Sequence, residues 1–249
     1  MARTGITAFL VGTAVAAVTI GAAVPAAASA PACSVRNGSA AFGSLQAAIA
    51  AAPAGSRLVI AGTCVGPFVI DKDLTLAGRD YGAHRPVLTG AHVSRVMIIE
   101  PVATVAISDV IIRDGNSTGP SGGGGLQNVG TVNLTRVLVT NNRTVGAGGG
   151  ILNLGDMVLV RSLVSKNVSG SDGGGIYNAG DLTTWRTDLV ANMAPGVGGG
   201  MFAEGIATMH GGRVTRNVAG DTGGGILTVN ILTLDGTRVF GNSPNDCEC

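Results

Sequence analysis

The chain has 249 residues, of which 41 are glycine and only 3% are aromatic. This composition is far from that of an average globular domain, and the lack of a Gly-X-Y period excludes collagen. The formal net charge is +1 and no run of lysine or arginine is present, so we expect no nucleic-acid partner.

Residues 1–30 have the pattern of a secretory signal peptide. Arg3 precedes an uncharged stretch, residues 6–24, which runs into the small-residue tract of residues 25–30. Cleavage after Ala28 or Ala30 would start the mature protein near residues 29–31. The alternative is a retained membrane anchor, because the apolar stretch is long enough to span a bilayer, although its alanine-rich composition makes it weakly hydrophobic. We expect a secreted or cell-surface protein with no membrane span after signal removal.

Residues 31–65 are expected to form an N-terminal cap and a first coil of a single domain, residues 31–249. Leu45, Ala48, Ile49 and Ala52 recur at helical spacing behind Ser44, a potential N-cap. The pattern predicts a short capping helix, which would cover apolar residues and unpaired strand edges at the end of the stack.

The apolar pattern of residues 66–122 predicts irregular coils of short strands. Residues 107–112 align with residues 134–139 at a spacing of 27, with the extra residues placed in a turn. Together with the first coil this region accounts for about three coils, which brings the expected total to about eight. The strand candidates of the first coil and of this region are residues 58–60, 68–70, 74–76, 87–89 and 96–99.

Residues 123–247 contain five 25-residue coils. Each begins with a Gly-Gly-Gly triplet followed by an aliphatic residue, and each later carries an aliphatic-x-x-Asn motif. Apolar residues between these marks alternate, which predicts strands. Stacked coils place equivalent residues about 4.8 Å apart in columns, so the aliphatic columns should point into a narrow interior. The triplets begin at Gly123, Gly148, Gly173, Gly198 and Gly223.

The recurring asparagines predict a structural ladder. Their amides can bond one another and the backbone of the neighbouring coil, which satisfies polar groups that a corner would otherwise bury unpaired. The alternative is five solvent-exposed loop residues. A shorter ladder is predicted at Asn128, Asn153 and Asn178. The main ladder consists of Asn142, Asn167, Asn192, Asn217 and Asn242.

Export makes the four cysteines candidates for disulfides. Cys33 and Cys64 flank the first structured segment, whereas Cys247 and Cys249 lie at the C-terminus. Two local pairs are the simplest of the three connectivities, although a bond between the last two would close a very small ring.

These features predict an all-β fold, a right-handed parallel β-helix. The segments LQAAIA (45–50), PAGSRLVI (53–60), GTC (62–64) and LTLAG (74–78) resemble the cap and first coil of pectin-lyase-like β-helix proteins. The five repeat motifs resemble the GGAI and FxxN repeats of polymorphic outer-membrane proteins, with valine or leucine in place of phenylalanine. This resemblance implies the fold but not an activity, because such scaffolds carry lyases, hydrolases, epimerases and adhesins alike.

Catalytic and metal-binding patterns are missing from the sequence. It lacks the Gly-His-Gly, Asp-Asp and Arg-x-Pro-x-x-Arg patterns that would resemble polysaccharide-cleaving enzymes, and no Cys/His cluster has zinc spacing. Asp156 and Asp181 share a column at a separation that retaining glycoside hydrolysis would need, but both adjoin glycines and are interpreted as turn formers. We expect no cofactor, with calcium only in the case of a lyase.

One surface stripe is the candidate ligand-binding site. Arg136, Arg161 and Arg186 form a column beside Trp185 and His210. Arginine binds carboxylates through a fork of donors, and tryptophan offers a flat face to a sugar ring. The alternative is a solvated edge whose arginines are spaced by repeat duplication.

The leading interpretation is therefore an exported, non-catalytic module that binds a polysaccharide or another cell-surface component. A polysaccharide lyase or glycoside hydrolase acting on an acidic polysaccharide is the alternative. The C-terminal end of the stack has no predicted helix to cover it, so we expect either a monomer whose tail covers this end or end-to-end association.

Overall fold

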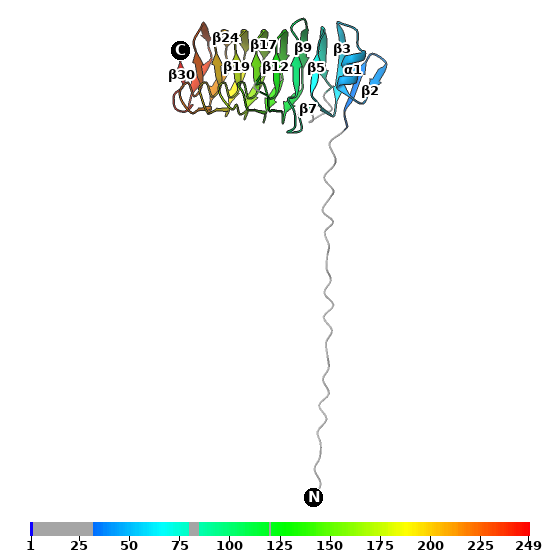
Figure 1. The fold of residues 1–249 in the computed structure, drawn as a ribbon, viewed down its shortest axis with the longest axis horizontal. Helices are drawn as coiled ribbons and strands as arrows, with labels where there is room; N and C mark the ends of the chain where they lie inside the picture. Colours follow the sequence, from blue (N-terminus) through cyan, green and yellow to red (C-terminus); the bar gives the residue numbers. More distant parts are fainter. Residues whose placement is uncertain (2–31, 80–84, 120) are drawn as a thin grey trace.

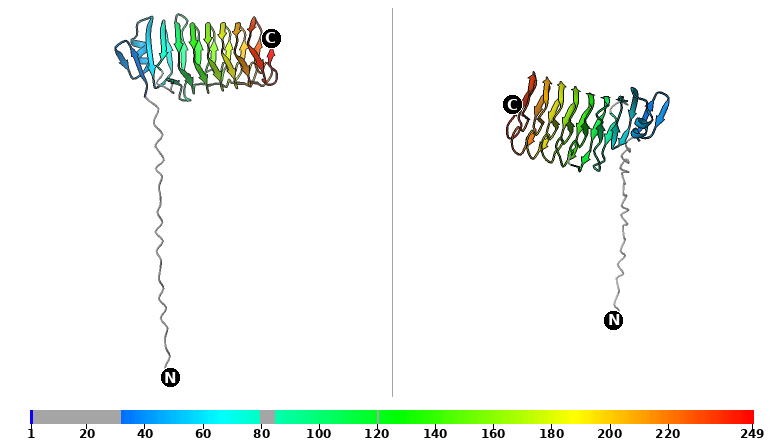
Figure 2. Two further views of the ribbon diagram at one scale, coloured as in Figure 1. Left: turned by 180° about the vertical axis from the view of Figure 1, so that it is seen from behind. Right: turned by 45° about the horizontal axis from the view of Figure 1, so that its top comes forward.

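The computed structural model describes residues 1, 32–79, 85–119 and 121–249 of the chain. The predicted fold class is confirmed, because this part is an all-β parallel β-helix of about seven turns, close to the expected eight. Figure 1 shows the strands stacked along one axis, with the N-terminal cap at one end and the C-terminus at the other, and Figure 2 shows the same stack from two further directions. The predicted signal peptide falls on residues that lie outside this description, apart from Met1.

Three sheets run the length of the stack, and we call the one with ten strands the long sheet. The long sheet contains, in spatial order, β2 (Ala40–Phe42), β1 (Ser34–Asn37), β3 (Ser56–Ala61), β6 (Leu74–Gly78), β9 (Thr104–Ser108), β13 (Thr131–Thr135), β17 (Asp156–Val160), β20 (Asp181–Trp185), β24 (Ile206–His210) and β28 (Leu232–Asp235). The second sheet contains β4 (Thr63–Val65), β7 (Val87–Thr89), β10 (Ile111–Arg113), β14 (Leu138–Thr140), β18 (Leu163–Ser165), β21 (Asp188–Val190), β25 (Arg213–Thr215) and β29 (Arg238–Phe240).

The third sheet completes each turn of the stack. It contains β5 (Phe68–Ile70), β8 (Met97–Ile99), β12 (Leu126–Asn128), β16 (Ile151–Asn153), β19 (Ile176–Asn178), β23 (Met201–Ala203), β27 (Ile226–Thr228) and β30 (Cys247–Glu248). Two short pairs lie between the second and third sheets along the chain: β11 (Asn116–Ser117) with β15 (Arg143–Thr144), and β22 (Met193–Ala194) with β26 (Val218–Ala219). All five strand candidates of the first coil and the irregular coils lie in or overlap strands of these sheets.

The 25-residue period of the sequence is the strand register of the structure. Ile151 pairs with Ile176, and Val164 with Leu189, in parallel ladders. All four side chains are buried, because the stacked coils close over the narrow interior that one coil alone could not form. The 27-residue spacing upstream is also confirmed, since Ile107 pairs with Leu134.

The glycine triplets mark a corner that has no room for side chains. Gly173 has a φ of +61°, the left-handed region that favours glycine. A Cβ on Gly174 would lie 2.5 Å from the carbonyl oxygen of Gly199 in the next coil. The triplets therefore allow adjacent coils to approach at their corners.

The predicted asparagine ladder is confirmed, and its amides are buried. Asn192 is 1% exposed. Its Nδ2 donates to Oδ1 of Asn217 and to the carbonyl of Val164, both at 3.0 Å, and its Oδ1 accepts from the backbone N and Nδ2 of Asn167, also at 3.0 Å. Asp246 ends the ladder, because its Oδ1 accepts from the backbone N of Asn242 at 2.9 Å and from its Nδ2 at 3.0 Å.

The shorter ladder is also present. Nδ2 of Asn128 donates to Oδ1 of Asn153 at 2.8 Å, and Asn153 donates in the same way to Asn178 at 2.7 Å. Each amide also donates to a backbone carbonyl two residues further along the chain. The two ladders thus fix two different corners of the coil.

The N-terminal cap contains one predicted and one unpredicted element. Helix α1 (Leu45–Ala51) begins after Ser44, whose Oγ accepts from the backbone N of Ala47 at 3.4 Å, as the sequence predicts. The antiparallel hairpin β1–β2 was not predicted, and it adds two strands to the edge of the long sheet. A disulfide joins Cys33 to Cys64 and attaches this cap to the first coil.

The C-terminal end is only partly covered by the last residues of the chain. Strand β30 pairs with β27, and a disulfide joins Cys247 to Cys249, so both predicted local pairs are confirmed. However, β28 and β29 are edge strands, and Leu234 on β28 is 37% exposed although its partner Met209 is fully buried. Among the described residues, no helix has the length and apolar character needed to cross a bilayer.

Candidate functional site

The last residues of successive strands in the long sheet form an outward-facing column. Strand pairing puts these residues in register, and the alternation of buried and exposed positions along each strand directs them away from the core. We call this the tryptophan column. It consists of Thr135, Val160, Trp185, His210 and Asp235.

Trp185 and His210 form a stacked pair in this column. Their ring centroids lie 3.8 Å apart and their planes differ by 14°. Because the two residues belong to adjacent strands, the indole plane stands across the column, with one face against the imidazole and the other toward Val160. Oδ2 of Asp235 lies 2.9 Å from Nδ1 of His210, which holds the imidazole in this position. The tryptophan remains 47% exposed.

The three predicted arginines follow the strand ends at a corner of left-handed backbone. Arg136, Arg161 and Arg186 have φ values of 55°, 49° and 49°, and Gly211 and Gly236 take the same conformation in the next two coils. The corner is needed because the chain must turn from the long sheet into the second sheet within a few residues. It directs the side chains of this column beside the tryptophan column, as the sequence predicts.

Two of these arginines flank a hollow beside the indole. Val160, Arg161, Trp185 and Arg186 line an open space of about 290 Å³. Val160 is shorter than the tryptophan that follows it in the column, which leaves room over the free face of the indole. Within the described part of the chain, neither guanidinium makes a hydrogen bond or an ion pair. The hollow therefore combines one aromatic face with two cations that have no partner among the described residues.

The guanidinium group of Arg136 forms an ion pair within the protein. Its Nε and Nη2 donate to the two carboxylate oxygens of Asp109, both at 2.6 Å, and its carbonyl accepts from Nη1 of Arg85 at 2.9 Å. The hydrogen bond and charge of Arg136 lower the pKa of the Asp109 carboxyl below its ordinary value. The structure thus places Arg136 in the predicted column, but its donor fork is already occupied.

Asp235 is a member of this cluster that sequence reasoning missed. It lies 25 residues after His210, so the column arithmetic that aligned the other members also gives its position.

The paired aspartates lie apart from this cluster. Asp156 and Asp181 are in register and exposed, at the first positions of β17 and β20. They therefore lie at the opposite ends of these strands from the tryptophan column. Among the described residues, no group of three or more histidine, cysteine or acidic side chains is arranged to hold a metal ion.

Comparison with known proteins identifies no relative: no family model, no curated protein and no solved structure matches this chain. The chemistry of the site must therefore be argued from its own residues.

Proposed function

We propose that this protein is an exported, non-catalytic β-helix that binds an acidic polysaccharide at the hollow beside Trp185. The observation that carries the proposal is the open indole face between the guanidinium groups of Arg161 and Arg186, neither of which has a partner in the described chain. Because these two guanidinium groups bind no carboxylate among the described residues, they are suited to bind a carboxylate of a ligand.

The two kinds of side chain would contribute different parts of the recognition. An aromatic ring presents a broad apolar surface on which the C–H face of a pyranose can stack. Arginine offers several N–H donors in a planar fork that matches the two oxygens of a carboxylate. A uronic acid unit carries both groups, so it fits the hollow better than a neutral sugar does.

Export is supported by the chain itself. The N-terminal residues have the signal-peptide pattern, and two disulfides are present. Disulfides persist mainly in oxidising compartments outside the cytosol. The resemblance of the cap and repeats to pectin-lyase-like and polymorphic outer-membrane proteins rests on sequence motifs alone, and the proposal does not depend on it.

Binding can be measured through Trp185 itself, since it is the single tryptophan of the chain. We expect polygalacturonate or alginate to change its fluorescence and to give saturable binding by calorimetry, with an affinity that falls as salt is added. Neutral dextran should not bind. Trp185→Ala and the double variant R161G/R186G should each lose about tenfold in affinity, because each removes one half of the recognition surface.

A matched control is available at the next corner of the coil. Lys166 and Arg216 are exposed and also have left-handed backbone, with φ values of 55° and 59°. The variant K166G/R216G removes the same charge and makes the same backbone substitution elsewhere, so it should bind as the wild type does. Equal losses in both double variants would mean that net charge, not the hollow, determines binding, and would refute the proposed site.

The second candidate function is a polysaccharide lyase or glycoside hydrolase. The contact between His210 and Asp235 favours it, because a histidine held by a carboxylate is a common general base. Incubation with polygalacturonate, alginate and chondroitin, with and without calcium, tests this directly. Unsaturated products that absorb in the ultraviolet would indicate a lyase, and new reducing ends without that absorbance would indicate a hydrolase. Either product, if it disappears in His210→Ala, would replace the non-catalytic proposal with the enzymatic one.

A further inference from the structure

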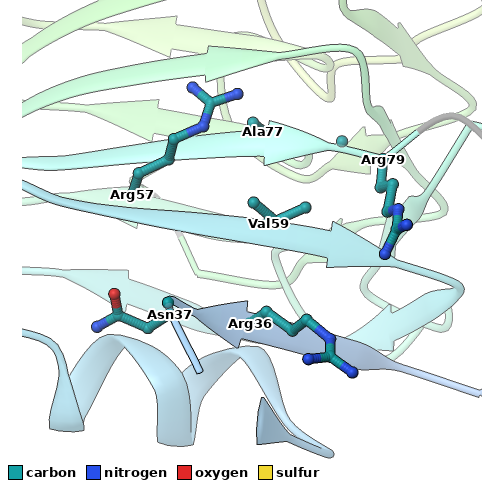
Figure 3. A pocket seen from close by; sticks show the side chains of 8 residues that line it. Arg36, Asn37, Arg57, Val59, Ala77 and Arg79 are labelled. Carbon is teal, nitrogen blue, oxygen red and sulfur yellow. The ribbon is translucent and has the colours of Figure 1, made fainter. Parts of the chain in front are cut away.

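A second, larger hollow lies at the N-terminal end of the long sheet. It has a volume of about 690 Å³, within the usual range for ligand sites. Figure 3 shows the arginines that line it, on the outer side of the strands next to the cap. Its lining consists of Arg36, Asn37, Gly38, Arg57, Val59, Ala77, Gly78 and Arg79.

Strand register explains how three arginines far apart in the sequence meet here. Arg36 on β1 pairs with Val59 on β3, and Val59 pairs with Ala77 on β6. Arg57 precedes Val59 by two residues and Arg79 follows Ala77 by two, so alternation places all of them on the same outer face. The two short apolar residues form the floor, and the three arginines surround it. We call these three residues the arginine triad.

The charge of this hollow is one-sided. Among the described residues that line it, three are cationic and none is acidic. The backbone N of Arg79 donates to the carbonyl of Ile60 at 2.7 Å, which fixes this residue at the strand end. A Cβ at Gly78 would lie 2.1 Å from the carbonyl oxygen of Asp109 in the neighbouring coil, so this position has no room for a side chain. The guanidinium groups of Arg36 and Arg57 offer donor forks that are suited to anionic oxygens, and Arg79 lies beside them.

The arginine triad and the hollow beside Trp185 lie on the same sheet. In the strand order β6, β9, β13, β17, β20, four steps separate the two sites. At about 4.8 Å per step they are about 19 Å apart along the axis of the stack. A ligand that fills both must therefore be a linear chain with anionic groups at intervals.

We propose that the arginine triad is a second anion-binding site, which takes a carboxylate-bearing unit of the same acidic polysaccharide chain that contacts Trp185. This inference rests on the proposed function and adds to it the direction in which the ligand lies, parallel to the axis of the stack. Two linked contacts raise affinity through effective concentration, so long chains should bind more tightly than short ones.

The test compares a galacturonate trimer with long-chain polygalacturonate by calorimetry on the disulfide-bonded mature protein. The variant R36Q/R57Q leaves Arg79 intact. Its matched control is R143Q/R216Q, which removes two exposed arginines outside the long sheet. We expect R36Q/R57Q to lose about tenfold in affinity for the long chain, and the control to lose none. In the background of Trp185→Ala, the trimer should still bind, and adding R36Q/R57Q should abolish that binding.

The outcomes separate the two proposals. Wild-type affinity of R36Q/R57Q for the long chain, together with a loss in Trp185→Ala, would overturn the second site and leave the proposed function standing. Loss of binding in R36Q/R57Q alone would support the arginine triad and move the binding function away from Trp185. Absence of any binding to the wild type would overturn both, and equally tight binding of dextran sulfate would overturn the assignment to carboxylate ligands.

Discussion

Replacement of Asn192 by alanine should destabilise the protein far more than replacement of an exposed asparagine. The Asn192 side chain makes four hydrogen bonds with the two neighbouring coils and is 1% exposed. Each such bond contributes about 1 kcal/mol net, and the groups left behind are buried without partners. We therefore expect the free energy of unfolding to fall by about 4 kcal/mol.

The control is Asn133→Ala on the outer face of β13. Asn133 is exposed and its side chain makes no hydrogen bond with the described residues, so its loss should change the free energy of unfolding by no more than about 0.5 kcal/mol. Urea unfolding of the mature protein, followed by circular dichroism, gives the midpoint and slope for both variants. A difference between N192A and N133A of less than about 1 kcal/mol would refute the assignment of the ladder as a principal source of stability.

The variant Asn192→Asp separates the contribution of the amide nitrogen to stability from that of the amide oxygen. The aspartate keeps an oxygen to accept from Asn167, but in its charged form it cannot donate to the carbonyl of Val164. Protonation restores a donor. N192D should therefore recover stability relative to wild type as the pH falls, whereas the N192A difference should stay constant, and the same urea measurement at two pH values checks this.

Three further outcomes follow from the structure. Arg186→Gly should raise the free energy of unfolding by about 0.5 kcal/mol, because glycine adopts the left-handed φ of this position without steric strain. The same variant should bind polysaccharide more weakly. A lower thermal stability would show that Arg186 is not strained. Arg136 lowers the pKa of Asp109 in the fold, so this stabilisation is fully present above the unfolded value of 3.8 and is lost as the pH falls through the folded pKa. Asp109→Asn should thus lose less stability than wild type on acid titration below about pH 4, as measured by circular dichroism. Replacing both Cys33 and Cys64 by serine should cost about 3.5 kcal/mol of unfolding free energy in urea, and an unchanged midpoint would contradict a structural role for this bond.

The repeat region could be predicted because one period controls all of its features. A fixed spacing of 25 residues aligns the buried aliphatic residues, the glycine corners and the asparagines at once, and the structure has each of these in register. Once the period is known, the position of Trp185 beside His210 is a matter of counting. The stripe was predicted at this level, but the stacking of the two rings depends on side-chain rotamers that a spacing does not specify.

Features that depend on pairing between unlike segments were not predicted. Strand β1 of the hairpin β1–β2 pairs antiparallel with β3 and belongs to no repeat, so its register has no counterpart elsewhere among the described strands. The arginine triad depends on that register. The left-handed backbone at Arg161 was also unexpected, because arginine has no preference for this conformation and the corner geometry imposes it. The ion pair between Arg136 and Asp109 joins residues 27 positions apart, outside the regular 25-residue period, so the repeat did not predict it.

The ladder also determines how such a chain can grow. Every inner asparagine donates its Nδ2 to the asparagine of the following coil and to a carbonyl of the preceding coil, and its Oδ1 accepts from the asparagine of the preceding coil. A duplicated 25-residue unit therefore enters the middle of the stack with these bonds satisfied. Each duplication adds one strand to every sheet and lengthens the outer face by about 4.8 Å. An insertion of one residue within a strand would break the alternation of inward and outward side chains, whereas the two extra residues of the 27-residue coil lie outside the paired strands and leave it intact. The length of the outer face therefore changes in steps of whole coils, through duplication and deletion.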